Sequence, residues 1–131
     1  MDSINLKRLV ALKVIVTEEF RKQLVDEATQ TISRIEDNLV ELNQNLDKLP
    51  PGDDTREMFN QLKRDREQLI QMKDELEWKI KEVENLSDGA EIPFQMLEGE
   101  VSVNVGDDVR EKMTKTEILV KDWKVVEIRN P

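Results

Sequence analysis

The chain contains no cysteine and no histidine in its 131 residues. Without cysteine it can form neither disulfides nor thiolate metal sites. Without histidine it lacks the commonest general base and metal ligand, so its serines have no imidazole partner that would activate them as nucleophiles. A glycine-rich phosphate-binding loop is also missing. These absences predict a protein that is not an enzyme and has no catalytic residues, cofactor or metal site.

Long apolar runs are missing as well. No stretch approaches the roughly 20 residues that a membrane-spanning helix needs. Lys7, Arg8 and Lys13 interrupt the apolar residues near the N-terminus, which does not resemble a secretory signal. We therefore expect a cytoplasmic protein without a membrane partner. The formal net charge is −9 and no segment is a basic block, which disfavours generic binding to a phosphate backbone.

Two apolar heptad arrays occupy the middle of the chain. The first array consists of Val25, Ala28, Ile32, Ile35, Leu39, Leu42, Leu46 and Leu49. The second consists of Met58, Leu62, Asp65, Leu69, Met72, Leu76, Lys79, Val83 and Leu86. Such repeats are typical of coiled coils, and the Pro-Pro-Gly-Asp-Asp turn at 50–54 predicts that the chain folds back there. We expect helices from Glu18 to Lys48, with Thr17 as N-cap, and from Asp54 or Thr55 to about Leu86.

The segments on either side of the heptads read as β-structure. Alternating apolar residues predict a first strand at 4–16 and a second strand from Leu97. A short helix at 108–115 is then expected, followed by a hairpin of strands 117–121 and 124–129. The predicted fold class is α+β: a small antiparallel β-sheet or partly open barrel carrying a long inserted antiparallel coiled-coil hairpin. Residues 1–16 and 89–131 would form the β domain, and residues 17–88 the insertion.

The turn between the helices carries three carboxylates, Asp53, Asp54 and Glu57. They could contact a partner or bind magnesium, but Asp54 followed three residues later by Glu57 also matches a capping box. The hexapeptide Gly-Asp-Asp-Thr-Arg-Glu at 52–57 recurs as Gly-Asp-Asp-Val-Arg-Glu at 106–111. Because the second copy also opens a predicted helix, we expect the carboxylates to cap backbone N–H groups.

Several apolar residues of the heptad region fall outside the seam, which is the row of a and d positions where the helices meet. Val40 and Ile70 occupy b positions, Trp78 a c position, and Phe59 and Ile80 e positions. Because a two-helix arm has no other core to cover them, they favour a contact surface over incidental exposure. We expect this surface to support docking of a protein partner or homo-oligomer formation.

A family resemblance rests on the strand that leads into a charged helical hairpin and on the C-terminal pattern. That pattern is Leu97-Glu98-Gly99-Glu100-Val101, Val103-Asn104-Val105-Gly106-Asp107, Glu117-Ile118-Leu119-Val120-Lys121-Asp122 and Val126-Glu127-Ile128-Arg129. Over essentially its whole length the chain resembles the bacterial YlqD family, although Trp123 stands where a turn glycine is expected. The resemblance implies an association with the ribosome, because the family's gene lies near ribosomal-protein and ribosome-maturation genes in some bacteria. It assigns no active residues.

Three functional hypotheses remain open. The first is a non-enzymatic interaction or scaffold protein that acts through the coiled-coil hairpin. The second is a ribosome- or RNA-associated factor that binds through the β domain. Its expected contacts are Lys7, Arg8, Lys13, Arg110, Lys112 and Lys115. The third is a hairpin factor that delivers the acidic residues of the turn to a partner.

Overall fold

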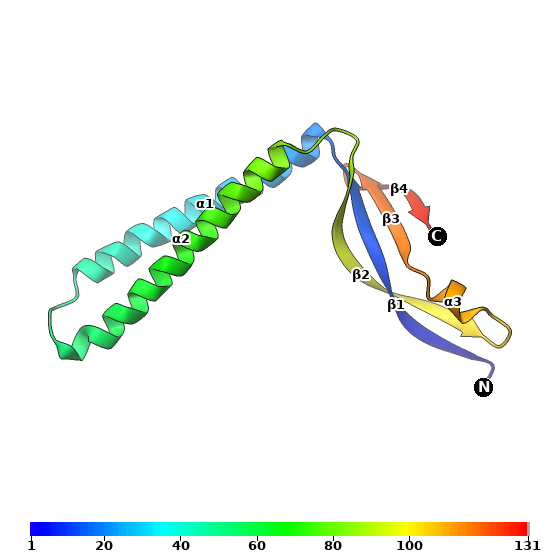
Figure 1. Cartoon of the computed structure of the whole chain (residues 1–131), viewed down its shortest axis with the longest axis horizontal. Helices are drawn as coiled ribbons and strands as arrows, with labels where there is room; N and C mark the ends of the chain where they lie inside the picture. Colours follow the sequence, from blue (N-terminus) through cyan, green and yellow to red (C-terminus); the bar gives the residue numbers. More distant parts are fainter. Residues whose placement is uncertain (131) are drawn as a thin grey trace. The chain divides into compact units, whose positions relative to one another are not determined.

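The computed structural model describes residues 1–130. The chain divides into two compact units by its internal contacts. The hairpin unit is Arg21–Leu86, and the sheet unit combines Met1–Phe20 with the chain from Ser87 onward. Figure 1 shows a pair of long helices between the first and second strands of the chain. No helix within residues 1–130 has the length and apolar content that crossing a membrane would require.

The two long helices end close to their predicted limits. Helix α1 is Glu18–Asp47 and helix α2 is Arg56–Glu84, with the short 3-10 helix η1 (Asp53–Thr55) between them. Thr17 caps α1 as predicted, because its hydroxyl oxygen accepts a hydrogen bond from the Phe20 N–H at 3.1 Å. Proline cannot continue a helix, and Pro50 and Pro51 open the turn shortly after α1 ends at Asp47.

Polar contacts between α1 and α2 fix their antiparallel alignment. Lys73 Nζ lies 3.2 Å from Glu36 Oε1, and Arg66 donates to Asn43 at 3.5 Å. Both contacts place Leu39 level with position 70, one residue from Leu69, which is the residue that matched heights of the two predicted helices set opposite Leu39. The alignment of the two helices is therefore close to the predicted one, whereas coiled-coil packing between them stays a prediction.

Burial follows the predicted seam in most places. Ile35 and Val83 are buried, with 4% and 7% of their surface exposed, and most other seam residues are half-buried. Met58, Met72 and Lys79 are exposed. The seam therefore holds the helices together unevenly, and supercoiling of α1 around α2 stays a prediction.

The capping role predicted for the acidic turn is wrong. The N-cap of α2 is Thr55, no side chain makes a cap hydrogen bond there, and none caps η1. The Thr55 hydroxyl instead donates to the Pro50 carbonyl oxygen at 2.7 Å, back across the turn. In the second copy of the hexapeptide, Asp108 does cap the short helix α3 (Val109–Lys112), accepting from the N–H groups of Arg110 and Glu111. The same hexapeptide pattern therefore caps a helix in the sheet unit but does not cap one after the proline turn.

The sheet contains four strands in the order β2-β1-β3-β4 (Figure 1). Their bounds are Ser3–Ile15 for β1, Glu91–Asn104 for β2, Thr116–Lys121 for β3 and Lys124–Arg129 for β4. Strands β2 and β4 form the two edges, so the sheet is not closed into a barrel.

The antiparallel sheet that we predicted is instead mixed. Strand β1 pairs antiparallel with β2 but parallel with β3. Because β2 occupies one side of β1, the chain crosses over through α3 and adds β3 on the other side, in the direction of β1. The first strand therefore lies inside the sheet, with a hydrogen-bonded neighbour on each side.

Strand β2 begins earlier than the alternation predicted, at Glu91 instead of Leu97. Pro93 and Phe94 break the alternating pattern. The register between β1 and β2 shifts at Leu12 and Lys13, which pair with Gln95 and Pro93 and leave Phe94 without a partner across the ladder. A bulge of this kind adds one residue to a strand and disguises its pattern.

The core of the sheet unit lies where β1 and β3 meet. Its buried residues are Ala11, Val14, Val16, Phe20, Thr116, Leu119 and Val120. The Phe20 ring packs against Phe94 and Trp123, with ring centroids 6.3 Å and 6.0 Å away, and Phe94 lies 5.3 Å from Trp123. This aromatic cluster joins the start of α1 to β2 and to the turn between β3 and β4.

Candidate functional site

Three of the predicted outer residues are strongly exposed on the hairpin unit. Val40 is 57% exposed, Ile70 43% and Trp78 63%. The alignment of α1 with α2 sets Val40 and Ile70 at nearly the same level, whereas Trp78 lies two turns further along α2. The Trp78 indole N–H donates to Glu82 Oε1 at 2.9 Å, so its polar edge is already satisfied within the helix. We call Val40, Ile70 and Trp78 the outer residues.

The other two residues predicted for this surface lie elsewhere. Ile80 is half-buried and lines a groove between the helices with Leu24 and Leu76, as an e position beside the seam allows, and its part in a contact surface stays a prediction. Phe59 is exposed but faces a hollow beside Leu49 and Pro50.

The carboxylate-bearing residues Asp53, Asp54 and Glu57 are all exposed. Arg56 lies between Asp54 and Glu57 in the sequence. Together with Pro50, Pro51 and Phe59 it lines the hollow at this end of the hairpin, which has a volume of about 320 Å³. We call residues 50–59 the tip. Within the described part of the chain, no group of three or more acidic residues is arranged to hold a metal ion.

A groove of about 400 Å³ on the sheet unit collects three of the six cations predicted for RNA contact. Its lining consists of Lys7, Arg8, Leu9, Met96, Glu98, Met113 and Lys115. Strand β1 supplies Lys7 and Arg8, and Lys115 comes from the segment just before β3. Arg8 also donates from Nη1 to the Lys112 carbonyl oxygen at 3.4 Å, which ties β1 to the end of α3. We call this feature the basic groove.

The remaining three predicted cations are engaged by acids. Lys13 Nζ lies 2.8 Å from Glu117. Arg110 and Lys112 each lie 3.8 Å from an aspartate of their own loop, Asp108 and Asp107 respectively. These three cations therefore lie outside the lining of the groove that Lys7, Arg8 and Lys115 share, and RNA contact by any of the six stays a prediction.

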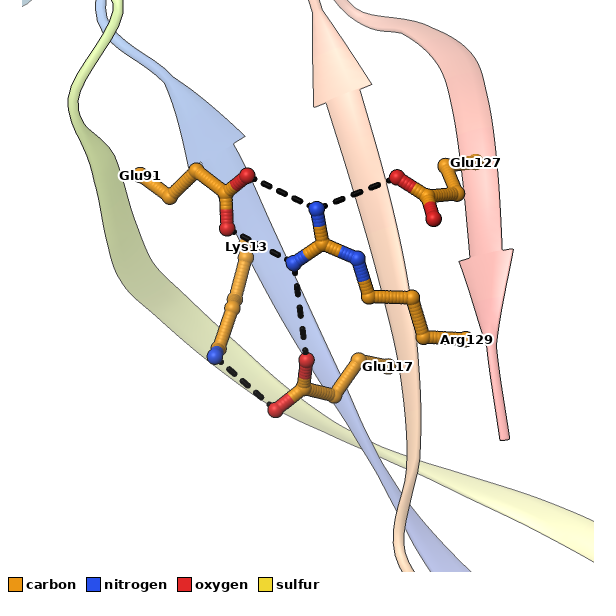
Figure 2. Close-up of polar contacts among 5 residues, drawn as sticks. All are labelled: Lys13, Glu91, Glu117, Glu127 and Arg129. Atoms are coloured by element: carbon orange, nitrogen blue, oxygen red, sulfur yellow. Dashed lines mark hydrogen bonds and ion pairs between the residues drawn. The ribbon is translucent and has the colours of Figure 1, made fainter. Parts of the chain in front are cut away.

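A network of ion pairs crosses the sheet and was not predicted. Figure 2 shows Arg129 of β4 between Glu91 of β2 and Glu127, with Glu117 of β3 linking it to Lys13 of β1. Arg129 donates to both oxygens of Glu91, at 2.7 and 2.8 Å, and to Glu127 at 3.0 Å. Apart from Glu127, which lies two residues from Arg129, the members come together only through the strand order, so local patterns could not reveal the whole network.

The ion-pair network shifts the pKa values of Glu91 and Arg129, the pair at its centre. The hydrogen bonds from Arg129 hold the pKa of Glu91 below its ordinary value. The same bonds, together with those to Glu127, raise the pKa of Arg129. Both effects keep the pair charged, so the network ties the edge strands to the centre of the sheet and does not provide a proton-transfer group.

These features define a class of α+β proteins in which a helical hairpin is inserted between the first two strands of a mixed four-stranded sheet. Residues 4–129 match the family described as "YlqD protein", and the chain belongs to the YlqD family. The resemblance stated from the sequence is thereby confirmed.

Two relatives extend the comparison. The chain is 26% identical over 120 residues to "Uncharacterized protein YlqD" of Bacillus subtilis (strain 168), covering 92% of this chain and 94% of that protein. It is also similar to a crystal structure of a protein of unknown function from Synechococcus sp. WH 8102. That likeness has a TM-score of 0.76 at 21% identity over 97% of this chain and 95% of the other, so it concerns the fold alone.

Proposed function

We propose that the protein is a non-enzymatic interaction protein whose helical hairpin docks a protein partner through the outer residues. The observation that carries this proposal is the exposure of Val40, Ile70 and Trp78 on the same helices whose seam residues Ile35 and Val83 are buried. Burying such side chains against a partner removes apolar surface from water, which favours association by about 25 cal/mol for each Å².

The chemistry of the outer residues supports this role. Single exposed apolar residues are normal on a protein surface. Tryptophan, however, is enriched among the few interface residues that dominate binding energy. The Trp78 indole N–H already donates to Glu82 within the helix, so docking the ring against a partner would not leave this donor without an acceptor.

Comparative affinity capture tests the proposal. The full chain serves as bait beside a variant with Val40→Ser, Ile70→Ser and Trp78→Ser. The matched control carries Glu41→Ser, Gln71→Ser and Glu77→Ser, three exposed polar neighbours on the same helices. Both triple variants remove large side chains from helix surfaces, so circular dichroism should report the same helix content for each.

The expected result is one set of proteins retained by the native chain and the control but lost from the outer-residue variant. Sedimentation equilibrium of the purified baits shows whether that partner is another copy of the chain. If the outer-residue variant retains every partner and every oligomer of the native chain, the proposed docking surface is wrong.

RNA binding through the sheet unit is a second candidate function. The observation that favours it is the convergence of Lys7, Arg8 and Lys115 around one groove. Binding to structured RNA, followed by fluorescence anisotropy from low to high salt, should weaken steeply as salt rises because counterions compete for the phosphates. Lys7→Ala with Lys115→Ala should flatten that salt dependence. If the affinity for RNA changes neither with salt nor with these substitutions, RNA binding through the groove is ruled out.

A further inference from the structure

The basic groove carries positive charge that the described residues do not neutralise. Lys7, Arg8 and Lys115 make no ion pair within residues 1–130, whereas Lys13, Lys112 and Arg129 all do. The Arg8 Nε atom is buried without an acceptor, and its single bond from Nη1 is long at 3.4 Å. Cations left unpaired around a concave site favour an anionic ligand.

The floor of the groove restricts what that ligand is. Leu9, Met96 and Met113 form an apolar lining, and methionine adapts to side chains of varied shape. None of the described residues that line the groove is aromatic, so it offers no ring on which a nucleic-acid base could stack. An occupant with both carboxylates and apolar side chains fits this lining better than RNA.

The tip of the hairpin has this composition. Asp53, Asp54 and Glu57 stand beside Pro50, Pro51 and Phe59, and no capping bond occupies the carboxylates at either helix start. Arg56 is the single cation of the tip, against three acids. Glu98 is the single acid of the groove, against three cations. The two surfaces are thus opposite in charge and alike in apolar content.

We propose that the basic groove binds the acidic tip of a second copy of this chain. Lys7, Arg8 and Lys115 would pair with Asp53, Asp54 and Glu57, and the apolar residues of the tip would cover Leu9, Met96 and Met113. Each copy has one tip and one groove, so this contact is heterologous and builds head-to-tail chains or closed rings. It does not involve the outer residues, and it therefore stands independently of the proposed function.

Two charge-reversed variants of the full chain test the contact by complementation. The groove variant carries Lys7→Glu and Lys115→Glu, and the tip variant carries Asp53→Lys and Asp54→Lys. A matched control, Lys22→Glu with Lys81→Glu, reverses two exposed cations of the hairpin unit. Sedimentation velocity of each protein alone, and of the two variants mixed, measures the species formed.

We expect the native chain and the control to associate, and each variant alone to associate at least about tenfold more weakly, because like charges then face each other. Mixing the two variants should restore association, since the intact tip of one variant meets the intact groove of the other, and the reversed tip and reversed groove also carry opposite charges. Association of the native chain should also weaken in about 1 M salt, where the Debye length is about 3 Å.

Three results would overturn the proposal. The first is a native chain that stays monomeric at high concentration. The second is association of the native chain that the outer-residue variant loses but the groove and tip variants retain. The outer residues, and not the groove and tip, would then mediate the association. The third is tight binding of a labelled single-stranded decauridylate that the groove variant alone loses, which would give the groove to RNA. Circular dichroism of each variant confirms that a loss of association is not a loss of folding.

Discussion

At the scale of single residues, Glu91 and Arg129 show how the sheet is joined across its width. Their side chains come from the two edge strands, and both Glu91 oxygens accept bonds from Arg129. The bond depresses the pKa of Glu91 in the folded state, below its ordinary value of 4.5. Such a group stabilises the fold above its unfolded pKa, and this contribution is lost as the pH falls through the folded value.

The first prediction concerns this pair. Carbon-detected NMR of the carboxyl groups should show Glu91 titrating below its ordinary pKa in the native chain. In Arg129→Gln the Glu91 pKa should return towards that value, because the charged donor is gone. The stability difference between the two proteins should narrow as the pH falls below about 4.5, the unfolded value. An unchanged Glu91 pKa in the variant would show that Arg129 does not hold it.

Trp123 occupies a backbone position that usually selects glycine. Asp122 and Trp123 form the two-residue turn between β3 and β4 with φ of 48° and 68°. Two positive φ angles match a type I′ hairpin turn, in which asparagine, aspartate and glycine are preferred. Packing of the Trp123 ring against Phe20 and Phe94 offsets the strain, and the Thr17 hydroxyl fixes the turn by donating to Asp122 at 2.8 Å.

The second prediction separates the strain at Trp123 from its packing. Trp123→Ala and Trp123→Gly remove the same ring contacts, but only alanine keeps a Cβ atom in the left-handed conformation. The glycine variant should therefore be more stable than the alanine variant by about 1 kcal/mol. Urea denaturation of both proteins measures the difference. An alanine variant that equals or exceeds the glycine variant would mean that the turn is relaxed, or that it adopts another conformation in solution.

At the scale of elements, the heptads predicted the helices well, and the flanking strands less well. The Thr17 cap and the proline turn marked the limits of α1 and α2, whereas the apolar spacing indicated which side of each helix is buried. The start of β2 was missed because the bulge at Phe94 breaks the alternation. The parallel pairing of β1 with β3 could not be predicted, since it depends on which side of β1 is still open after β2 has paired.

The third prediction tests the seam against the outer surface of the same helix. Ile35→Ala should lower the free energy of unfolding of the hairpin unit by about 2–3 kcal/mol, because it removes buried contacts and leaves a cavity. Val40→Ala should change it by no more than about 0.5 kcal/mol, as is usual for exposed positions. Denaturant unfolding followed by circular dichroism at the helix band compares them. Similar losses from both substitutions would contradict the assigned seam.

The fourth prediction uses the repeated hexapeptide. Asp108→Ala should destabilise the sheet unit by roughly 0.5–1 kcal/mol, because its side chain accepts two backbone bonds at the start of α3. Asp54→Ala should leave stability within about 0.5 kcal/mol of the native value, because no cap bond is lost. Thermal unfolding of the two variants distinguishes the copies. Equal destabilisation would show that Asp54 caps its helix after all.

At the scale of the whole molecule, the sequence predicted which apolar residues of the helices are exposed better than it predicted how the charged residues group. Val40, Ile70 and Trp78 are exposed as predicted because the heptad register determines which side of a helix faces the solvent. The six predicted cations divide into three around the basic groove and three held by acids. That division depends on the strand order and on loop contacts, which charge patterns along the chain do not encode.

The central claim is that the hairpin docks a protein partner through its outer residues, and site-specific photo-cross-linking in living cells tests it most directly. A photoreactive benzoylphenylalanine would replace Ile70 or Trp78, and in a control it would replace Lys121, an exposed residue at the end of β3. The account predicts a discrete higher-mass adduct from both hairpin positions after irradiation, and none from position 121. Equal adducts from all three positions, or none from positions 70 and 78, would contradict it.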